Sequence, residues 1–258
     1  MFAGLEIVMQ KELDICVLAD LHLGTMGSNP IELLKYLKSI KPGLLIISGV
    51  FINPDQFEKK YFSRKTLMII HQIMQMALAG TKVVLVTGAG NEGLKRFTGV
   101  NIGNVHLRKE MLLKLRGKEY LVCTYPIEKK SSGRGNISIW KKISGLFPRR
   151  KSGLKVNKNS VSKQLIKYAY SKGVSALISC DLNNAGLSET IQNNKTLELL
   201  NPGSWDQSLT ALEFSGGQWE HYIYNELDYG LLNPKLTVKE EKQKEKEEVF
   251  IIRKPIGG

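Results

Sequence analysis

A carboxylate and an imidazole stand two residues apart in the segment Asp20-Leu-His22-Leu-Gly24. The pair ends an apolar run, residues 14–20, that is typical of a buried strand, so both side chains are expected where that strand ends. An Asp and a His at this spacing can bind one divalent metal ion. The same two residues also fit a purely structural role, with Asp20 capping the next turn and His22 bonded to the main chain.

The elements around this pair alternate in type. Strands are predicted at residues 14–20, 44–48 and 82–87, with helices at 31–40 and 61–79 between them. This βαβαβ order predicts parallel strands, and ligands of such sheets lie beyond the carboxyl ends of the strands. The loops at 20–22, 48–50 and 87–91 are therefore expected to converge.

The second half of the chain is predicted to form a mixed sheet that faces the first. Its strands are expected at 119–124, 175–179, 196–200, 209–214 and 219–224, the last two joined by a hairpin turn at 215–217. The chain as a whole is predicted to be an α/β protein, with a folded domain over residues 1–234 and a charged tail over 235–258.

The net charge of +13 is concentrated in one segment. Residues 129–172 hold 13 Lys and Arg and no acid, and the rest of the chain holds 24 basic and 24 acidic residues. Such a segment is suited to an anionic partner: nucleic acid, phospholipid headgroups or a phosphorylated ligand. Its apolar residues recur at helical spacing among the cations, which is typical of a helix lying on an anionic bilayer. The predicted lipid contacts are Trp140, Lys141, Lys142, Phe147, Arg149, Arg150 and Lys151.

Two other readings of this basic segment remain: a solvated lid, and a nucleic-acid surface. Nucleic acid is disfavoured because the sequence has no motif of an RNA- or DNA-binding module. Three cysteines suit a reducing compartment better than a disulfide framework, and no apolar run reaches the length of a membrane span. The expected location is the cytoplasm, with peripheral contact at the inner face of the membrane.

Most of the chain, from about residue 14 to 226, resembles the calcineurin-like metallophosphoesterases. Within them it is similar to the bacterial UDP-2,3-diacylglucosamine pyrophosphohydrolases of lipid A synthesis. The resemblance implies a four-layer α/β/β/α sandwich, two metal ions between the sheets, a metal-bound water that hydrolyses phosphate esters or pyrophosphates, and a helical lid, here residues 129–172. It is carried by residues 19–24, 32–42, 45–49, 80–88, 92–97 and 201–213.

Only the first pair of metal ligands in that family is kept here, as Asp20 and His22. In the family motif G-D-x-x-D, Val50 stands at the Asp that bridges the two metals and Asn53 at the later Asp. The remaining motif positions are also changed: Ala89, Gly90 and Asn91 in G-N-H-D, Cys123 at a ligand His, Cys180-Asp-Leu-Asn183 in G-H-x-H, and Ser204 in G-D-W.

The change at Val50 argues against the family's usual mechanism. Two dications about 3.5 to 4 Å apart repel strongly, and a shared anionic ligand makes the pair tolerable. An isopropyl group supplies no lone pair, and His71, His106 and His221 fall outside the motifs. We therefore expect a catalytically degenerate homologue that acts in binding or regulation, with no cofactor and with no catalytic residue that we can name.

A rebuilt hydrolase is the alternative. Asp20, His22, Cys123, Asp181 and Asn183 form a mixed S/N/O set that suits one Zn²⁺ or Mn²⁺. Otherwise Cys123 is a small buried apolar residue and Asp181 caps a turn. The expected partners are an anionic lipid surface and a phosphorylated lipid or nucleotide-sugar ligand; the sequence names no protein partner.

Overall fold

The computed structural model describes residues 10–52, 63–87, 97–125 and 158–230. The chain divides into two units, Met1–Ile223 and Tyr224–Gly258. The first unit holds both sheets. In the described part of the second, α7 (Leu227–Gly230) is one helical turn, and Tyr224 stacks on Tyr229 with ring centroids 4.9 Å apart.

Seven strands form the first sheet, in the order β12-β11-β1-β2-β3-β5-β4. Strands β1, β2 and β3 run parallel, as the βαβαβ pattern predicts, and β5, which was not predicted, runs parallel to β3. The outer strands pair antiparallel to their neighbours. The strands are β1 (Lys11–Ala19), β2 (Ile40–Gly49), β3 (Lys82–Thr87), β4 (Asn101–Ile102), β5 (Val105–Arg108), β11 (Thr210–Ser215) and β12 (Gln218–Ile223).

Five strands form the second sheet, in the order β6-β7-β8-β10-β9. It is mixed, as expected, because β8 runs parallel to both β7 and β10 while the outer pairs are antiparallel. The strands predicted at 209–214 and 219–224 were expected in this sheet, which is wrong. They are β11 and β12 of the first sheet, because β11 pairs antiparallel with β1. The strands are β6 (Glu110–Leu115), β7 (Lys118–Cys123), β8 (Ala176–Ile178), β9 (Gly186–Gln192) and β10 (Lys195–Asn201).

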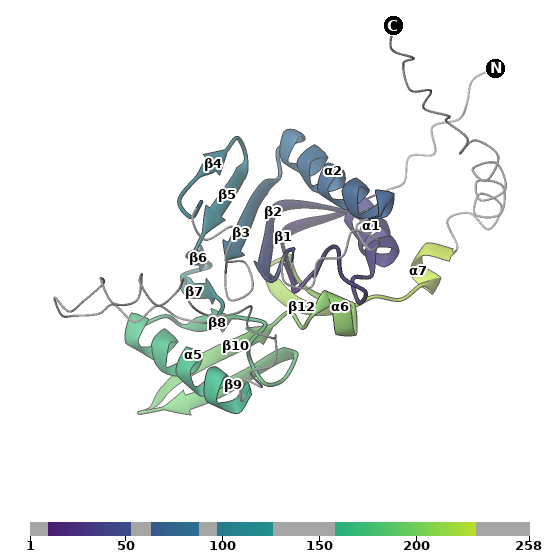
Figure 1. Ribbon diagram of the computed structural model, residues 1–258. Helices are drawn as coiled ribbons and strands as arrows, with labels where there is room; N and C mark the ends of the chain where they lie inside the picture. Colours follow the sequence, from purple (N-terminus) through teal and green to yellow (C-terminus); the bar gives the residue numbers. More distant parts are fainter. Residues whose placement is uncertain (1–9, 53–62, 88–96, 126–157, 231–258) are drawn as a thin grey trace, which may run out of the picture. The chain divides into compact units, whose positions relative to one another are not determined.

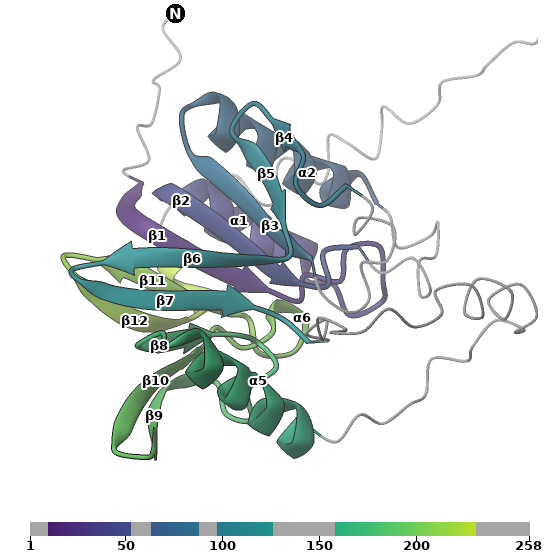
Figure 2. The same ribbon diagram turned by 90° about the vertical axis from the view of Figure 1, so that its left-hand side faces the viewer.

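The main core lies between the two sheets. It joins Val17 and Val84 of the first sheet to Val122 and Ile178 of the second. Two helices, α1 (Pro30–Ser39) and α2 (Arg64–Leu78), lie together over the first sheet (Figure 1). The helix α5 (Lys158–Lys172) lies over the second sheet (Figure 2). The predicted four-layer α/β/β/α sandwich is confirmed.

The predicted lid, residues 129–172, is described only from residue 158 onward, so all seven predicted lipid contacts lie outside the described residues. Its last part is α5, which buries Val161, Leu165 and Ala169 against Leu121 and Leu177 of the second sheet. This part of the basic segment is a layer of the sandwich. Among the described residues, no helix is long and apolar enough to cross a membrane.

Candidate functional site

The loops that follow β1 and β2 meet at the carboxyl ends of these strands. The N–H of Asp20 donates to the Ser48 carbonyl at 3.1 Å, and the N–H of His22 donates to the Val50 carbonyl at 3.1 Å. Two of the three predicted loops therefore converge. Most of the third, which holds Ala89, Gly90 and Asn91, lies outside the described residues, as does Asn53.

The carboxylate of Asp20 is held by groups from both sheets. The main-chain N–H of Val50 donates a 2.9 Å hydrogen bond to Asp20 Oδ1. The thiol of Cys180, just after β8, donates a second bond to the same carboxylate. A Cβ at Gly49, where φ is +71°, would lie 2.2 Å from Asp20 Oδ1 and 3.1 Å from Cys180 Sγ. Only glycine leaves room for this arrangement.

The main chain at this turn is strained. Asp20 and His22 have φ angles of 49° and 44°, in the left-handed region that non-glycine residues rarely adopt. Each such residue costs about 1–2 kcal/mol, so the surrounding bonds must hold the turn in place. Strain of this kind is concentrated at ligand-binding turns, which marks the strand end as the candidate site.

Burial dominates the electrostatics of this turn. Burial raises the pKa of Asp20, and Asp206 raises it further, while the Val50 N–H, His22 and Cys180 oppose the rise. Burial also raises the pKa of Cys180 well above its usual value, and the nearby carboxylates of Asp20 and Asp181 act in the same direction. Cys180 therefore faces Asp20 as a neutral thiol, which is a hydrogen-bond donor to the carboxylate.

The structure adds one carboxylate that the sequence analysis missed. Asp206, in the short helix α6 (Trp205–Ser208), places Oδ2 3.8 Å from His22 Nε2. Its main-chain N–H donates to the Asp20 carbonyl at 3.3 Å, and Ser204 Oγ donates to Asp206 Oδ1. The signal for it was an acid two positions after Ser204, the residue that stands where the resemblance implies an Asp.

The remaining predicted ligands lie elsewhere. Cys123 is buried in the apolar cluster under α5, and burial raises its pKa to about 12. Asp181 Oδ2 accepts a 2.8 Å bond from the N–H of Tyr125, which follows β7, so this bond is a long-range contact and not the turn cap considered above. Asn183 is exposed. The cysteine that reaches Asp20 is Cys180.

These residues do not fit the two-metal centre that the resemblance implies. The N–H of Val50 bonds Asp20 Oδ1, and the isopropyl side chain of Val50 has no lone pair with which to bridge two metal ions. Within the described ranges, no three His, Cys, Asp or Glu side chains lie where they could hold a metal ion together. Asp20, His22 and Asp206 do lie close together there, with His22 Nε2 3.8 Å from Asp206 Oδ2.

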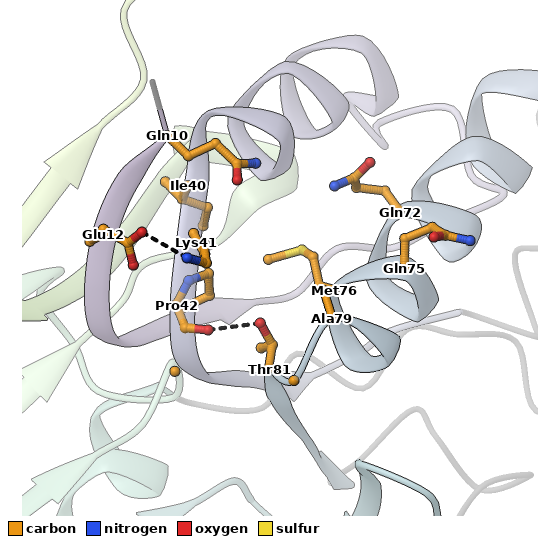
Figure 3. Close-up of a pocket in the computed structure, with 12 residues that line it drawn as sticks. Gln10, Glu12, Ile40, Lys41, Pro42, Gln72, Gln75, Met76, Ala79 and Thr81 are labelled. Carbon is orange, nitrogen blue, oxygen red and sulfur yellow. Dashed lines mark hydrogen bonds and ion pairs between the residues drawn. The ribbon is translucent and has the colours of Figure 1, made fainter. Parts of the chain in front are cut away.

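The other histidines lie away from the strand end. His71 is exposed on α2, His106 bonds Asn101 at 2.8 Å at the edge of the first sheet, and His221 lies in β12. A cavity of about 500 Å³ lies beside the end of α2 and the start of β2, where Gln72, Gln75 and Met76 face Ile40 and Lys41 (Figure 3). None of the residues that line this cavity belongs to the candidate site at the end of β1.

No family model and no curated protein matches the chain by sequence. Several solved structures resemble it at low identity. An archaeal phosphodiesterase is 10% identical, with 81% of this chain and 98% of that chain covered and a TM-score of 0.40. A single mutant of Vps29 from Entamoeba histolytica is 12% identical, with 82% and 99% covered and a TM-score of 0.38. A predicted phosphoesterase from Streptococcus pneumoniae TIGR4 is 12% identical, with 82% and 97% covered and a TM-score of 0.34.

Proposed function

We propose that this chain is a metallophosphoesterase-fold protein that has lost the two-metal hydrolytic activity of that fold and acts in binding or regulation. The observation that carries the proposal is the hydrogen bond from the Val50 N–H to Asp20 Oδ1. The residue that the resemblance places at the metal bridge supplies only a main-chain donor to this carboxylate. Without a shared anionic ligand, two dications repel, and the usual activation of water is lost.

Contacts within the protein hold this turn together. Main-chain bonds join Asp20 to Ser48 and His22 to Val50, and Cys180 bonds the carboxylate from the second sheet. We take the ligand to be a phosphorylated lipid or nucleotide sugar, because the similarity to the lipid A pyrophosphohydrolases extends over most of the chain. The basic segment is proposed to contact anionic lipid at the membrane surface.

A second candidate is a phosphohydrolase with a single metal. The observation in its favour is the set of Asp20, His22 and Asp206, whose last two members form a 3.8 Å ion pair. One Zn²⁺ needs three or four converging ligands. This candidate therefore requires a shift of these side chains toward one another on metal binding.

Metal analysis separates the two candidates. For a degenerate protein, we expect well under one equivalent of Zn, Mn or Fe in the purified chain. We also expect no metal-dependent hydrolysis of UDP-diacylglucosamine or bis(p-nitrophenyl) phosphate, and no change in Tm with EDTA. One tightly bound equivalent that disappears in Asp206→Asn would establish the single-metal hydrolase instead. Two bound metals would contradict both candidates.

The membrane proposal has its own test. Vesicles with phosphatidylglycerol or cardiolipin should bind the protein and neutral vesicles should not, with binding weakening as salt screens the charges. Charge reversal at Arg149, Arg150 and Lys151 should abolish binding, and Trp140→Ala should weaken it. Equal binding to neutral and anionic vesicles would contradict a charge-based contact.

A further inference from the structure

A cavity of about 280 Å³ lies between β3, β5 and the start of β6. Its lining includes three basic side chains, Lys82, His106 and Arg108. The parallel register pairs Val84 with His106 and Val86 with Arg108. Because side chains of a strand alternate between faces, His106 and Arg108 share one face of the sheet with Lys82 of β3.

The one acid in the lining is already bound to other groups. Glu110 accepts a 2.8 Å bond from Lys172 Nζ and a 2.7 Å bond from the Tyr168 hydroxyl, both on α5. Lys82 has no acidic partner among the residues that the structure describes. The cavity therefore carries an excess of positive charge with no anion of the described chain to neutralise it.

One amide orients two of these basic side chains. Asn101 Oδ1 accepts hydrogen bonds from His106 Nδ1 at 2.8 Å and from Arg108 Nη2 at 2.7 Å. Since a carbonyl oxygen only accepts, Nδ1 of His106 carries the hydrogen, and Nε2 is the nitrogen that can take up a proton. Arg108 also donates from Nη1 to the Leu107 carbonyl at 2.8 Å, so three of its five N–H groups have no partner among the described residues.

The larger cavity of Figure 3 differs from the smaller one in the balance of its charges. Its two charged lining residues, Glu12 and Lys41, pair with each other at 2.9 Å, and amides such as Gln72 and Gln75 supply its other polar side chains. Its charges cancel, so it has no preference for an anion. The smaller cavity carries an excess of positive charge and therefore prefers an anion.

We propose that the cavity lined by Lys82, His106 and Arg108 binds a tetrahedral oxyanion, the phosphate monoester group of a small molecule. A volume near 280 Å³ is at the low end of ligand pockets and admits a phosphate with a short organic part. Arg108 supplies fork-shaped donors that match phosphate geometry, and Lys82 supplies a point charge. This cavity shares no residue with the candidate site at the end of β1. The proposal therefore does not depend on whether hydrolysis is lost at that site.

His106 makes anion binding in this cavity depend on pH. Burial lowers the pKa of His106, and Lys82 and Arg108 lower it further. The groups that face it are Lys82 from β3, Arg108 from its own strand and Glu110 from β6. A bound dianion offsets the two cations, so His106 takes up a proton as the anion binds.

The test is a titration with sulfate, which stays dianionic from pH 5 to 8, followed by NMR of the histidine rings. The chain has four histidines, and the His106→Gln variant identifies the signal of interest. We expect a saturable shift of that signal, and tighter binding at lower pH in the wild type but not in His106→Gln. A linear, unsaturable response would overturn the proposal.

Three charge-matched variants test the site itself. Arg108→Gln and Lys82→Gln should each weaken sulfate binding about tenfold or more, because each removes charged donors. Lys114→Gln removes the same charge from β6, outside the lining, and should change affinity less than about twofold. Lys82 is exposed, so its variant remains informative if Arg108→Gln fails to fold. Equal weakening in all three variants would mean a general charge effect and no site.

Two further arms identify the source of the phosphate. Competition of glycerol 3-phosphate with sulfate would assign the site to a soluble phosphate monoester. Binding to vesicles of phosphatidic acid that is lost in Arg108→Gln, with no competition from glycerol 3-phosphate, would assign it to a lipid headgroup. If neither compound engages the site, the phosphate assignment is wrong.

Discussion

The main-chain N–H of Val50 lies 2.9 Å from Asp20 Oδ1 and donates a hydrogen bond to it. By resemblance, the side chain at position 50 would bridge two metal ions, one of which Asp20 would bind. Here the two residues are joined directly. The carboxylate thus has a structural role, in which it fastens the end of β1 to the end of β2, and this role can be separated from any metal binding by mutation.

The first prediction compares two changes at Asp20. Asp20→Asn keeps an oxygen for the Val50 N–H and tolerates a φ of 49°, so the free energy of unfolding should change by less than about 1 kcal/mol. Asp20→Ala leaves the N–H without that acceptor and strains the main chain, and should cost about 2–4 kcal/mol. Urea unfolding measures both. Equal losses in the two variants would show that the negative charge itself stabilises the fold.

The second prediction concerns the space beside this carboxylate. Gly49→Ala would place a Cβ 2.2 Å from Asp20 Oδ1, whereas Gly173→Ala, at the same φ of +71°, meets nothing within 4 Å. Gly173→Ala should therefore cost only the backbone strain of about 1–2 kcal/mol. Gly49→Ala should cost about 2–5 kcal/mol, because it adds steric overlap. Similar losses at the two sites would mean that Asp20 moves aside freely.

Sequence patterns predicted β1, β2 and β3 well because the apolar runs of these strands are continuous. They placed the start of β2 at residue 44, whereas the strand begins at Ile40. The structure shows that pairing with β3 begins only at Leu44, so Pro42 sits where β2 has β1 as its neighbour and an absent N–H is tolerated.

The site was harder to predict than the fold. Asp20 and His22 stand in a recognisable motif, but Cys180 and Asp206 reach them from β8 and α6, more than 150 residues further along the chain. Local spacing carries no information about such contacts. The short strands β4, β5, β6 and β9 were missed for a related reason, because their residues are largely exposed or partly buried and show no clear alternation.

The third prediction concerns a buried carboxylate in the core. Glu213, whose side chain is 2% exposed, accepts bonds from Lys11 Nζ at 2.5 Å and from the Tyr36 hydroxyl at 2.8 Å. Tyr36→Phe keeps the ring contacts with Trp205 and Tyr222 but removes one hydrogen-bond donor from this acid. It should lower the free energy of unfolding by about 1–3 kcal/mol, measured by thermal or urea unfolding.

A matched control for this change lies on α5. Tyr168 donates a 2.7 Å bond to Glu110, whose side chain is 35% exposed, so Tyr168→Phe removes the same kind of bond where water can replace it. We expect a loss below about 1 kcal/mol there. A larger loss at Tyr168 than at Tyr36 would contradict the view that burial of Glu213 makes its bond costly to lose.

The fourth prediction is a dependence of stability on pH through His221. Burial lowers the pKa of this histidine from 6.5, and a bond to the Pro202 carbonyl only partly opposes the shift. Its Nε2 is buried without a hydrogen-bond partner among the described residues, so a proton there would create a buried donor with no acceptor. The folded state therefore binds fewer protons than the unfolded chain in the interval below pH 6.5.

It follows that the free energy of unfolding contributed by His221 is present above pH 6.5 and is lost as the pH falls below it. Between pH 7.5 and 5.5, the Tm of the wild type should fall more than the Tm of His221→Gln, which keeps a donor for Pro202 and does not titrate. His71→Gln, an exposed change on α2, should leave the pH dependence as in the wild type. If the wild type and His221→Gln lose stability in parallel, the acid sensitivity arises from other groups.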